Sequence, residues 1–169
     1  MELATMITLL EDHAVVISSL VGRISEHQAR WKPDAENWSI LEVINHLYDE
    51  EREDFRVRLD FILNRTGEAW PPIDPRGWVN LREYNQRGLA ISLQSFLFER
   101  EQSLQWLKSL LDINWELTCT TPWGQITAGD MLAAWVAHDV LHLRQLVELH
   151  WALTGQAALP FNPQYAGDW

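Results

Sequence analysis

The sequence is poor in cysteine and in positive charge. Its 169 residues include a single cysteine, Cys119, which excludes an internal disulfide and a cysteine-rich zinc module. Lysine and arginine number 13, against 24 aspartate and glutamate residues, and the net charge is −11. Because phosphate groups repel such a chain overall, nucleic acid is not an expected partner.

Long apolar runs and an N-terminal basic cluster are also lacking. The longest purely apolar run, from Met131 to Ala137, has seven residues, whereas a helix that crosses a bilayer needs about 20. No basic residue precedes Arg23, so the N-terminus does not have the positive start of a secretory signal peptide. We therefore expect a cytoplasmic protein with no membrane partner.

Apolar residues, and tryptophan above all, are plentiful. The composition is 47% hydrophobic and includes ten tryptophans. A chain of this length and composition can bury the core of one domain, so we expect residues 1–169 to form a single unit. The tryptophans predict large buried rings or an apolar surface that pairs with another copy.

Apolar residues recur every three or four positions in four long stretches, which predicts four helices. The first runs from Leu3 to Ile24. The second begins at Ser39, where Ser-Ile-Leu-Glu forms a capping box, and continues to about Asn64. The third is expected over Leu81–Leu111, and the fourth begins after Thr127 and stops at Gly155.

Two of these helices carry patterns that predict their environment. The fourth helix is apolar almost all round from Met131 to Leu143, so it should be the most buried. The second helix carries many charges that are expected to face solvent and to pair one turn apart. These residues are Asp49, Glu51, Arg52, Asp54, Arg56 and Arg58.

Proline and glycine mark the connections between the helices. Residues 65–80 contain three prolines and two glycines and predict a long crossover between helices two and three. Residues 112–126 are expected to hold a short strand or ribbon. The tail, residues 155–169, should pack over the bundle through its aromatic residues. The fold class is thus all-α, a four-helix bundle with one long crossover.

Three histidines stand out as candidate metal ligands. His138 and His142 are four residues apart on the most apolar helix, so their rings point to one side. His46 lies on the inward side of the second helix and is the obvious third donor. From the residues alone, a metal site and a set of histidines hydrogen-bonded to polar neighbours both remain open.

Three segments of the chain resemble the DinB-like (DinB/YfiT) superfamily. They are Trp38–Leu47, Trp123–Leu132 and Ala137–Leu146. The resemblance implies a four-helix bundle, frequent homodimers, and a divalent metal held by one histidine of the second helix and two of the fourth. Carried onto this chain, the implied ligands are His46, His138 and His142.

Three neutral imidazoles would leave at least one coordination position open, as in catalytic rather than structural sites. Zinc and nickel are the first candidates, and copper and iron also accept imidazole. A bound water or a thiol, such as a low-molecular-weight thiol cofactor, could be activated there. Because the family includes thiol-dependent S-transferases, the resemblance implies a metal-dependent S-transferase or hydrolase acting on a small molecule. The alternative is a non-catalytic ligand-binding or stress-response module that uses the bundle pocket and a dimer surface.

Four further residues are candidates for the surroundings of the site. Glu50 lies one turn after His46 and could be a fourth ligand, an acceptor behind the histidine, a general base, or a surface charge paired with arginine. Gln145, Trp135 and His13 are candidate pocket residues. For Gln145 the alternative is an interhelical hydrogen bond, and for His13 it is a satisfied side chain at the edge of the apolar stripe.

Four of the tryptophans and the cysteine each allow two interpretations. Trp38, Trp78, Trp123 and Trp135 either cover the metal or serve as core and dimer contacts. Cys119 would act as a nucleophile only with a base beside it, and packing is the better interpretation.

Overall fold

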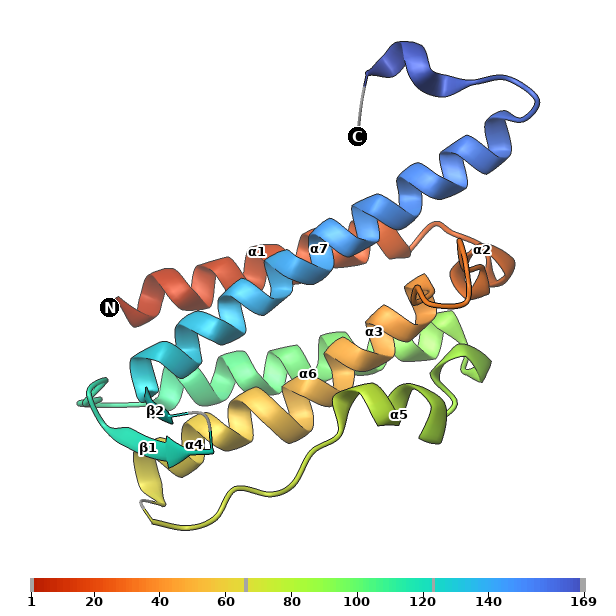
Figure 1. Cartoon of the computed structure of the whole chain (residues 1–169). Coiled ribbons are helices and arrows are strands. Elements are labelled where there is room, and N and C mark those ends of the chain that lie inside the picture. Colours follow the sequence, from red (N-terminus) through yellow and green to blue (C-terminus); the bar gives the residue numbers. More distant parts are fainter. Residues whose placement is uncertain (1, 66, 123, 168–169) are drawn as a thin grey trace.

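The computed structural model describes residues 2–65, 67–122 and 124–167, and most of them are helical (Figure 1). Four long helical segments form a bundle. They are α1 (Leu3–Val21), α3 (Ile40–Asp49) continued by a π-helix (Glu50–Phe55) and α4 (Arg56–Asn64), α6 (Leu89–Ser109), and α7 (Ala128–Ala158). The four-helix bundle expected from the sequence is therefore confirmed.

The long crossover gives the bundle its topology. The helices α1 and α7 run in one direction, and the segment α3–α4 and α6 run in the other (Figure 1). Because α4 and α6 are consecutive long helices that run the same way, residues 65–88 must return along the whole bundle. Within this return lie α5 (Pro75–Leu81), which is capped by Asp74, and a short 3-10 turn (Tyr84–Gln86).

The helix starts follow the capping signals in the sequence. The hydroxyl of Ser39 accepts from the N–H of Glu42, and the side chain of Glu42 accepts from the N–H of Ser39. Thr127 and Asp130 form the same reciprocal pair at the start of α7. A third capping box opens the short helix α2 (Glu26–Arg30), a helix that the sequence patterns did not indicate.

The sequence pattern predicts the start of the third helix too early in the chain. The segment begins at Leu89 rather than Leu81, with Gly88 as its N-cap. Glu83 has a left-handed backbone conformation, with φ at 49°, which separates α5 from the turn that follows. The periodicity of apolar residues ran on across this break and hid it.

The connection before α7 is a β-hairpin, as expected in outline. The strands β1 (Thr118–Thr121) and β2 (Gly124–Thr127) pair in antiparallel fashion, with Cys119 opposite Ile126. Cys119 is half-buried against the hydrophobic core, which agrees with a packing role. The hairpin lies at the end of the bundle where α1 begins (Figure 1).

The last helix is longer than expected and the tail does not cover the bundle. Gly155 lies within α7, which continues to Ala158 and carries its last turns beyond the other helices (Figure 1). The tail therefore starts away from the core, and in its described part Leu159, Phe161 and Tyr165 are exposed. Trp169, one of the proposed anchors, lies outside the described residues.

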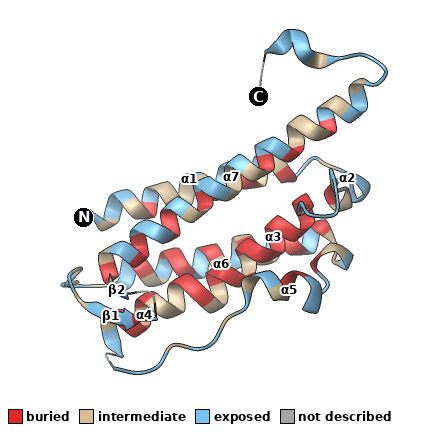
Figure 2. Ribbon diagram, in the orientation of Figure 1, coloured by how far each residue is buried: buried red, intermediate tan, exposed pale blue. Residues whose placement is uncertain are grey.

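The most buried helix is α3, not α7. Every residue of α3 except Tyr48 is buried, because α2, α5, α6 and α7 surround it (Figure 2). In contrast, α7 packs on one side only, and its apolar residues Val140 and Leu141 are exposed. The prediction that the fourth helix is the most buried is therefore wrong, although apolar residues lie on all its sides.

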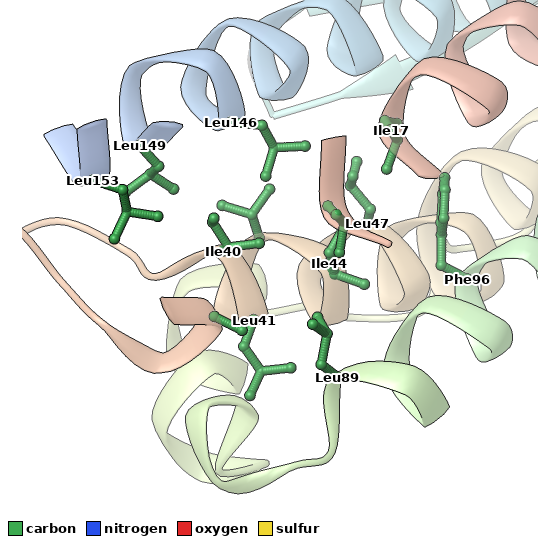
Figure 3. Packing of buried hydrophobic residues seen from close by; sticks show 13 residues of the cluster. Ile17, Ile40, Leu41, Ile44, Leu47, Leu89, Phe96, Leu146, Leu149 and Leu153 are labelled. Atoms are coloured by element: carbon green, nitrogen blue, oxygen red, sulfur yellow. The ribbon is translucent and has the colours of Figure 1, made fainter. Parts of the chain in front are cut away.

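Two hydrophobic clusters fill the bundle, one toward each end. The first combines Ile17 of α1, residues 40–47, Phe96 of α6 and Leu146, Leu149 and Leu153 of α7 (Figure 3). The second, near the hairpin, joins other positions of the same helices. It consists of Ile7, Leu10, Phe55, Leu59, Ile62, Leu104, Leu107, Ala128, Met131, Leu132, Trp135 and Val136.

Among the described helices, α1 alone is long and apolar enough to cross a membrane. The core helices of water-soluble bundles often meet the same criterion of length and composition. Its stripe of Ile7, Leu10, Ala14, Ile17 and Val21 is buried in the bundle.

Candidate metal centre

A layer of polar side chains separates the two hydrophobic clusters. Each long helical segment contributes to it at the position where its residues pass from one cluster to the other. The members of the layer are His13, His46, Glu50, Glu51, Arg100, Ser103, His138, Asp139 and His142. Because buried polar groups are costly unless they are paired or ligated, this layer is the place to look for function.

The three predicted histidines meet within this layer. The Nε2 atom of His138 lies 3.3 Å from Nε2 of His46 and 3.1 Å from Nε2 of His142. All three ligand atoms lie within 4.8 Å of one another. His46 is buried, while His138 and His142 are only partly buried, so the cluster can be approached from outside the bundle.

The distances in this cluster fit a shared metal ion. With zinc–nitrogen bonds of about 2.0 to 2.1 Å, two ligand nitrogens at the tetrahedral angle are about 3.3 Å apart. The separations of 3.1 and 3.3 Å between the histidine nitrogens match this value. The three histidines could therefore hold a divalent metal ion.

A neighbouring side chain fixes the proton of one histidine. Nδ1 of His142 lies 2.8 Å from Oε1 of Gln145, one turn further along α7. Because the amide oxygen only accepts, Nδ1 of His142 carries the proton and its Nε2 has a free lone pair. Gln145 thus holds His142 in the form that a metal ligand requires.

Burial keeps all three histidines neutral. Desolvation, followed by the neighbouring His142 and His138, lowers the pKa of His46 to about 2. Desolvation and the proximity of His142 lower the pKa of His138 to about 3, and burial also lowers the pKa of His142. Since only the neutral ring can ligate a metal, protons compete weakly for these sites near neutral pH.

Glu50 lies behind His46, on a π-helix. Its Oε1 is 3.9 Å from Nδ1 of His46, and both atoms are buried without a hydrogen-bond partner. Burial, with the nearby Asp54 carboxyl, raises the pKa of Glu50 to about 9. Because Glu50 faces Nδ1 rather than the converging Nε2 atoms, its position fits an acceptor for His46 better than a fourth ligand.

Not all of the charged residues around the π-helix face solvent, although the sequence pattern predicts that they do. Asp49, Glu51 and Asp54 are buried rather than exposed to solvent. A π turn closes its hydrogen bonds over five residues instead of four, so the side chains drift from the α-helical pattern on which the expectation relied. Asp49 is held inside by Tyr84, whose hydroxyl donates to it at 2.5 Å, and by Arg82 at 2.7 Å.

A second buried cluster lies beside the histidines, centred on Arg100. Its guanidinium donates two hydrogen bonds to Asp139, at 2.7 and 2.8 Å, and one to Glu51 at 2.5 Å. It also donates to the backbone oxygen of Leu10 at 2.9 Å. Arg100 is 2% exposed, so its positive charge is held entirely by these partners.

The two carboxylates of this cluster are fully partnered as well. Burial raises the pKa of Glu51, while Arg100, Ser103 and Trp135 oppose the rise because each donates a hydrogen bond to the anion. Burial also acts to raise the pKa of Asp139, but His13 and Arg100 hold it below its usual value.

Two of the predicted pocket residues belong to this second cluster. Nδ1 of His13 lies 3.3 Å from Oδ2 of Asp139, so His13 is a satisfied side chain. Trp135 is buried, stacks on Phe55 and donates from Nε1 to Glu51 at 2.9 Å. Neither residue lines the cavity beside the histidines.

That cavity is lined by Trp38 and Gln145, two residues that contact the histidines, whereas no histidine of the cluster is among its lining residues. The Trp38 ring centre is 4.9 Å from that of His46, and the ring is parallel to His142 at 6.3 Å. The cavity has a volume of about 390 Å³ and is also lined by Glu36, Asn37 and Arg76. A molecule bound there would contact two side chains that themselves contact the histidines.

The other tryptophan candidates are placed elsewhere or not described. Trp78 is buried with Val79 and Tyr84, and the guanidinium of Arg82 lies 3.9 Å from its ring centre. Trp123 lies outside the described residues.

Sequence reasoning missed Arg100 and Glu51. Asp139 follows His138 directly and so points away from it on the helix, and the pattern of one helix does not show that Arg100 packs against that side. Arg100 lies between Glu99 and Glu101 and so looks like part of a charged run. The available signal was its spacing, four residues after Phe96 and four before Leu104, which places it on the apolar face of the helix.

Comparison with known proteins identifies the family. The model of the DinB superfamily matches residues 9–146. The chain superimposes on the structure of YfiT from Bacillus subtilis with a TM-score of 0.79 and 20% sequence identity, over 90% of this chain and 88% of that one. That structure is described as a probable metal-dependent hydrolase with an unusual four-helix bundle topology. No curated protein matches the sequence. With the family model matching most of its length, the chain belongs to the DinB superfamily.

Proposed function

We propose that the protein is a divalent-metal-dependent enzyme that acts on a small molecule at His46, His138 and His142. The observation that carries this proposal is the convergence of three histidines, in which Nε2 of His138 lies 3.1 Å from Nε2 of His142 and 3.3 Å from Nε2 of His46. Zinc and nickel are the first candidates for the metal. The description of YfiT as a probable metal-dependent hydrolase supports a reaction of this class.

The bound ion would supply either a water of lowered pKa, toward about 7, or a thiol held as its thiolate. The chain itself contributes the positioning of the ligands. Gln145 accepts from Nδ1 of His142, and Glu50 faces Nδ1 of His46 at 3.9 Å, where it could accept a hydrogen bond from it after a small shift. The half-exposed edges of His138 and His142 leave one side of the cluster accessible to a substrate.

Two reaction types fit this arrangement, hydrolysis and transfer of a thiol. The first test is elemental analysis of the purified protein, in which we expect about one equivalent of divalent metal per chain. The metal-loaded protein is then assayed for ester and amide hydrolysis, and for S-transfer from low-molecular-weight thiols to electrophiles. Protein that binds no divalent ion at micromolar concentration would contradict the proposal.

Glu50→Gln separates a positioning role from a general base. If Glu50 only orients His46, the variant keeps some activity and its pH profile is unshifted, while its metal affinity falls about 10- to 100-fold. If Glu50 is the base, metal affinity is retained, kcat falls about 100-fold or more with KM unchanged, and the acidic limb of the profile disappears.

The second candidate function is a non-catalytic ligand-binding or stress-response module. A separate cavity of about 420 Å³ between α1 and α6 favours it, since Val21, Ile24, Leu89, Leu93 and Leu97 line it. Such a module would bind an apolar ligand equally well with and without a chelator. The enzyme hypothesis predicts turnover that a chelator removes.

We further propose a cytoplasmic homodimer that binds neither nucleic acid nor membranes. Exposed apolar side chains on the neighbouring helices α1 and α7 support a paired surface. They are Val15, Val16, Val140, Leu141 and Val147. The net charge of −11 opposes binding to phosphate backbones. Light scattering after gel filtration tests the dimer, and Val140→Glu should yield monomers if this face is the interface.

A further inference from the structure

Most basic side chains of this acidic protein are already paired with carboxylates. Ten of the thirteen form an ion pair among the described residues. The three that do not are Arg23, Arg76 and Arg87. Arg87 donates instead to Asn45 and lies over the ring of Tyr84, so Arg23 and Arg76 are the two with no such partner in the described part of the chain.

Arg76 lies at the cavity beside the histidines. It enters from α5, while Trp38 comes from the loop before α3 and Gln145 from α7. These two residues are the ones that contact the histidine cluster. A molecule bound at Arg76 therefore shares the cavity with the two side chains that contact the histidines.

The lining of the cavity indicates which chemistry it accepts. Arg76 is its only cation, and Glu36 is its only anion among the described residues. The two form no ion pair with each other in the described structure, since no nitrogen and oxygen of the pair come within 4.0 Å. Asn37 and Gln145 add amide groups, and Trp38 offers an aromatic face.

We infer that Arg76 binds a carboxylate of the substrate and that the enzyme acts on small monocarboxylates. The inference rests on the proposed metal-dependent function. A guanidinium can donate two parallel hydrogen bonds to a carboxylate, which fixes the orientation as well as the position of the bound molecule. Glu36 disfavours a second negative charge in the same cavity.

The test uses two small thiols of similar size, one with a carboxylate and one with a neutral amide beside the thiol. Mercaptoacetate and mercaptoacetamide both offer a thiol to the metal, but only the former carries a carboxylate at neutral pH. Each is titrated into the cobalt-loaded protein, and binding is followed by the change in the visible absorption of cobalt. For the wild type we expect mercaptoacetate to bind about tenfold more tightly than mercaptoacetamide.

Four variants test which side chain causes the preference for mercaptoacetate. Arg76→Gln should remove it, while Arg76→Lys should retain part of it because the charge remains. Arg23→Gln makes the same charge change away from the cavity and should behave as the wild type. Glu36→Gln should strengthen binding of mercaptoacetate and leave mercaptoacetamide unaffected. Circular dichroism checks that α5 and the bundle remain folded in each variant.

The outcomes distinguish this inference from the proposed function. If cobalt binds but both probes bind equally, or if Arg76→Gln and Arg23→Gln reduce the preference alike, the role of Arg76 is overturned and the metal site stands. If no cobalt spectrum develops with the wild type, the metal-dependent function fails, and the inference fails with it.

Discussion

The two polar clusters in the middle of the bundle differ in how completely their atoms are paired. Around Arg100, Glu51 and Asp139, each buried charged atom has a hydrogen-bond partner. In the histidine cluster, three lone-pair nitrogens face one another, and Nδ1 of His46 has no partner. The first cluster has its partners within the protein, whereas the second presents nitrogens that could hold a metal ion.

This difference separates structure from function within one layer. Asp139 follows His138 directly on α7, and Arg100 ties it to α6. The paired cluster therefore fixes the rotation of α7 that turns His138 and His142 toward His46. Saturated hydrogen bonds hold the scaffold, and the unsaturated nitrogens are left for a ligand.

The largest expected effect comes from breaking the paired cluster. Arg100→Met leaves the carboxylates of Glu51 and Asp139 buried without their cation, which should lower the free energy of unfolding by about 3 to 5 kcal/mol. Urea denaturation followed by circular dichroism measures the loss. Arg144→Met is the matched control, because Arg144 pairs with Glu148 at the surface and its loss should cost less than about 1 kcal/mol.

Arg100→Met by itself could leave the chain unfolded, so a combined variant keeps the test decisive. Replacing Arg100, Glu51 and Asp139 together by Met, Leu and Leu removes the charges and the need to pair them. The combined variant should be more stable than Arg100→Met alone. If it is less stable, the cluster contributes by packing and not by charge compensation.

Breaking the histidine cluster should have the opposite profile, with a large effect on metal binding and a small effect on folding. His142→Ala removes one of three ligands and should weaken zinc affinity at least about 100-fold. Isothermal titration with zinc measures it, and His27→Ala, on the exposed surface, is the control. A variant that still binds zinc as the wild type does would show that His142 is not a ligand.

Much of the histidine cluster in the polar layer could be predicted from the sequence. The spacing of His138 and His142 places both rings on one face of any α-helix, and the capping boxes at Ser39 and Thr127 set the start of the helices that carry the site. These are local rules, and residues within one helical turn decide them. The inward position of His46 on the second helix made it the third candidate, and the family resemblance implied the same three residues.

The cluster around Arg100 could not be predicted in the same way, because the residues that form its hydrogen bonds are far apart in sequence. Arg100 and Asp139 are 39 residues apart, and Glu51 and Trp135 are 84 apart. The π-helix also shifts Glu51 and Asp54 from the positions that an α-helical pattern gives them. Which buried face meets which depends on tertiary packing, and a single sequence does not encode that in its periodicity.

The pH dependence of stability offers a sharper comparison of the two halves. The pKa of His46 is lowered to about 2 and that of His138 to about 3, so between pH 6.5 and about 3 the unfolded chain binds protons that the folded chain does not. The metal-free protein should lose stability as the pH falls through this window, by up to about 1.4 kcal/mol per pH unit for each histidine. His138→Gln should reduce this slope, and the exposed His27→Gln should not. Urea midpoints at several pH values, measured with a chelator present, decide the point.

The smallest expected effect concerns the one hydrogen bond that the histidine cluster already makes. Gln145→Leu removes the acceptor of Nδ1 of His142 without touching a ligand. Because the ring can then carry its proton on either nitrogen, zinc affinity should fall by about tenfold. Gln145→Glu keeps the acceptor and adds a negative charge, so its affinity should equal or exceed that of the wild type. Competition with a chelating dye measures both variants, and equal affinities for Gln145→Leu and wild type would mean that the ring is held by packing against Trp38 instead.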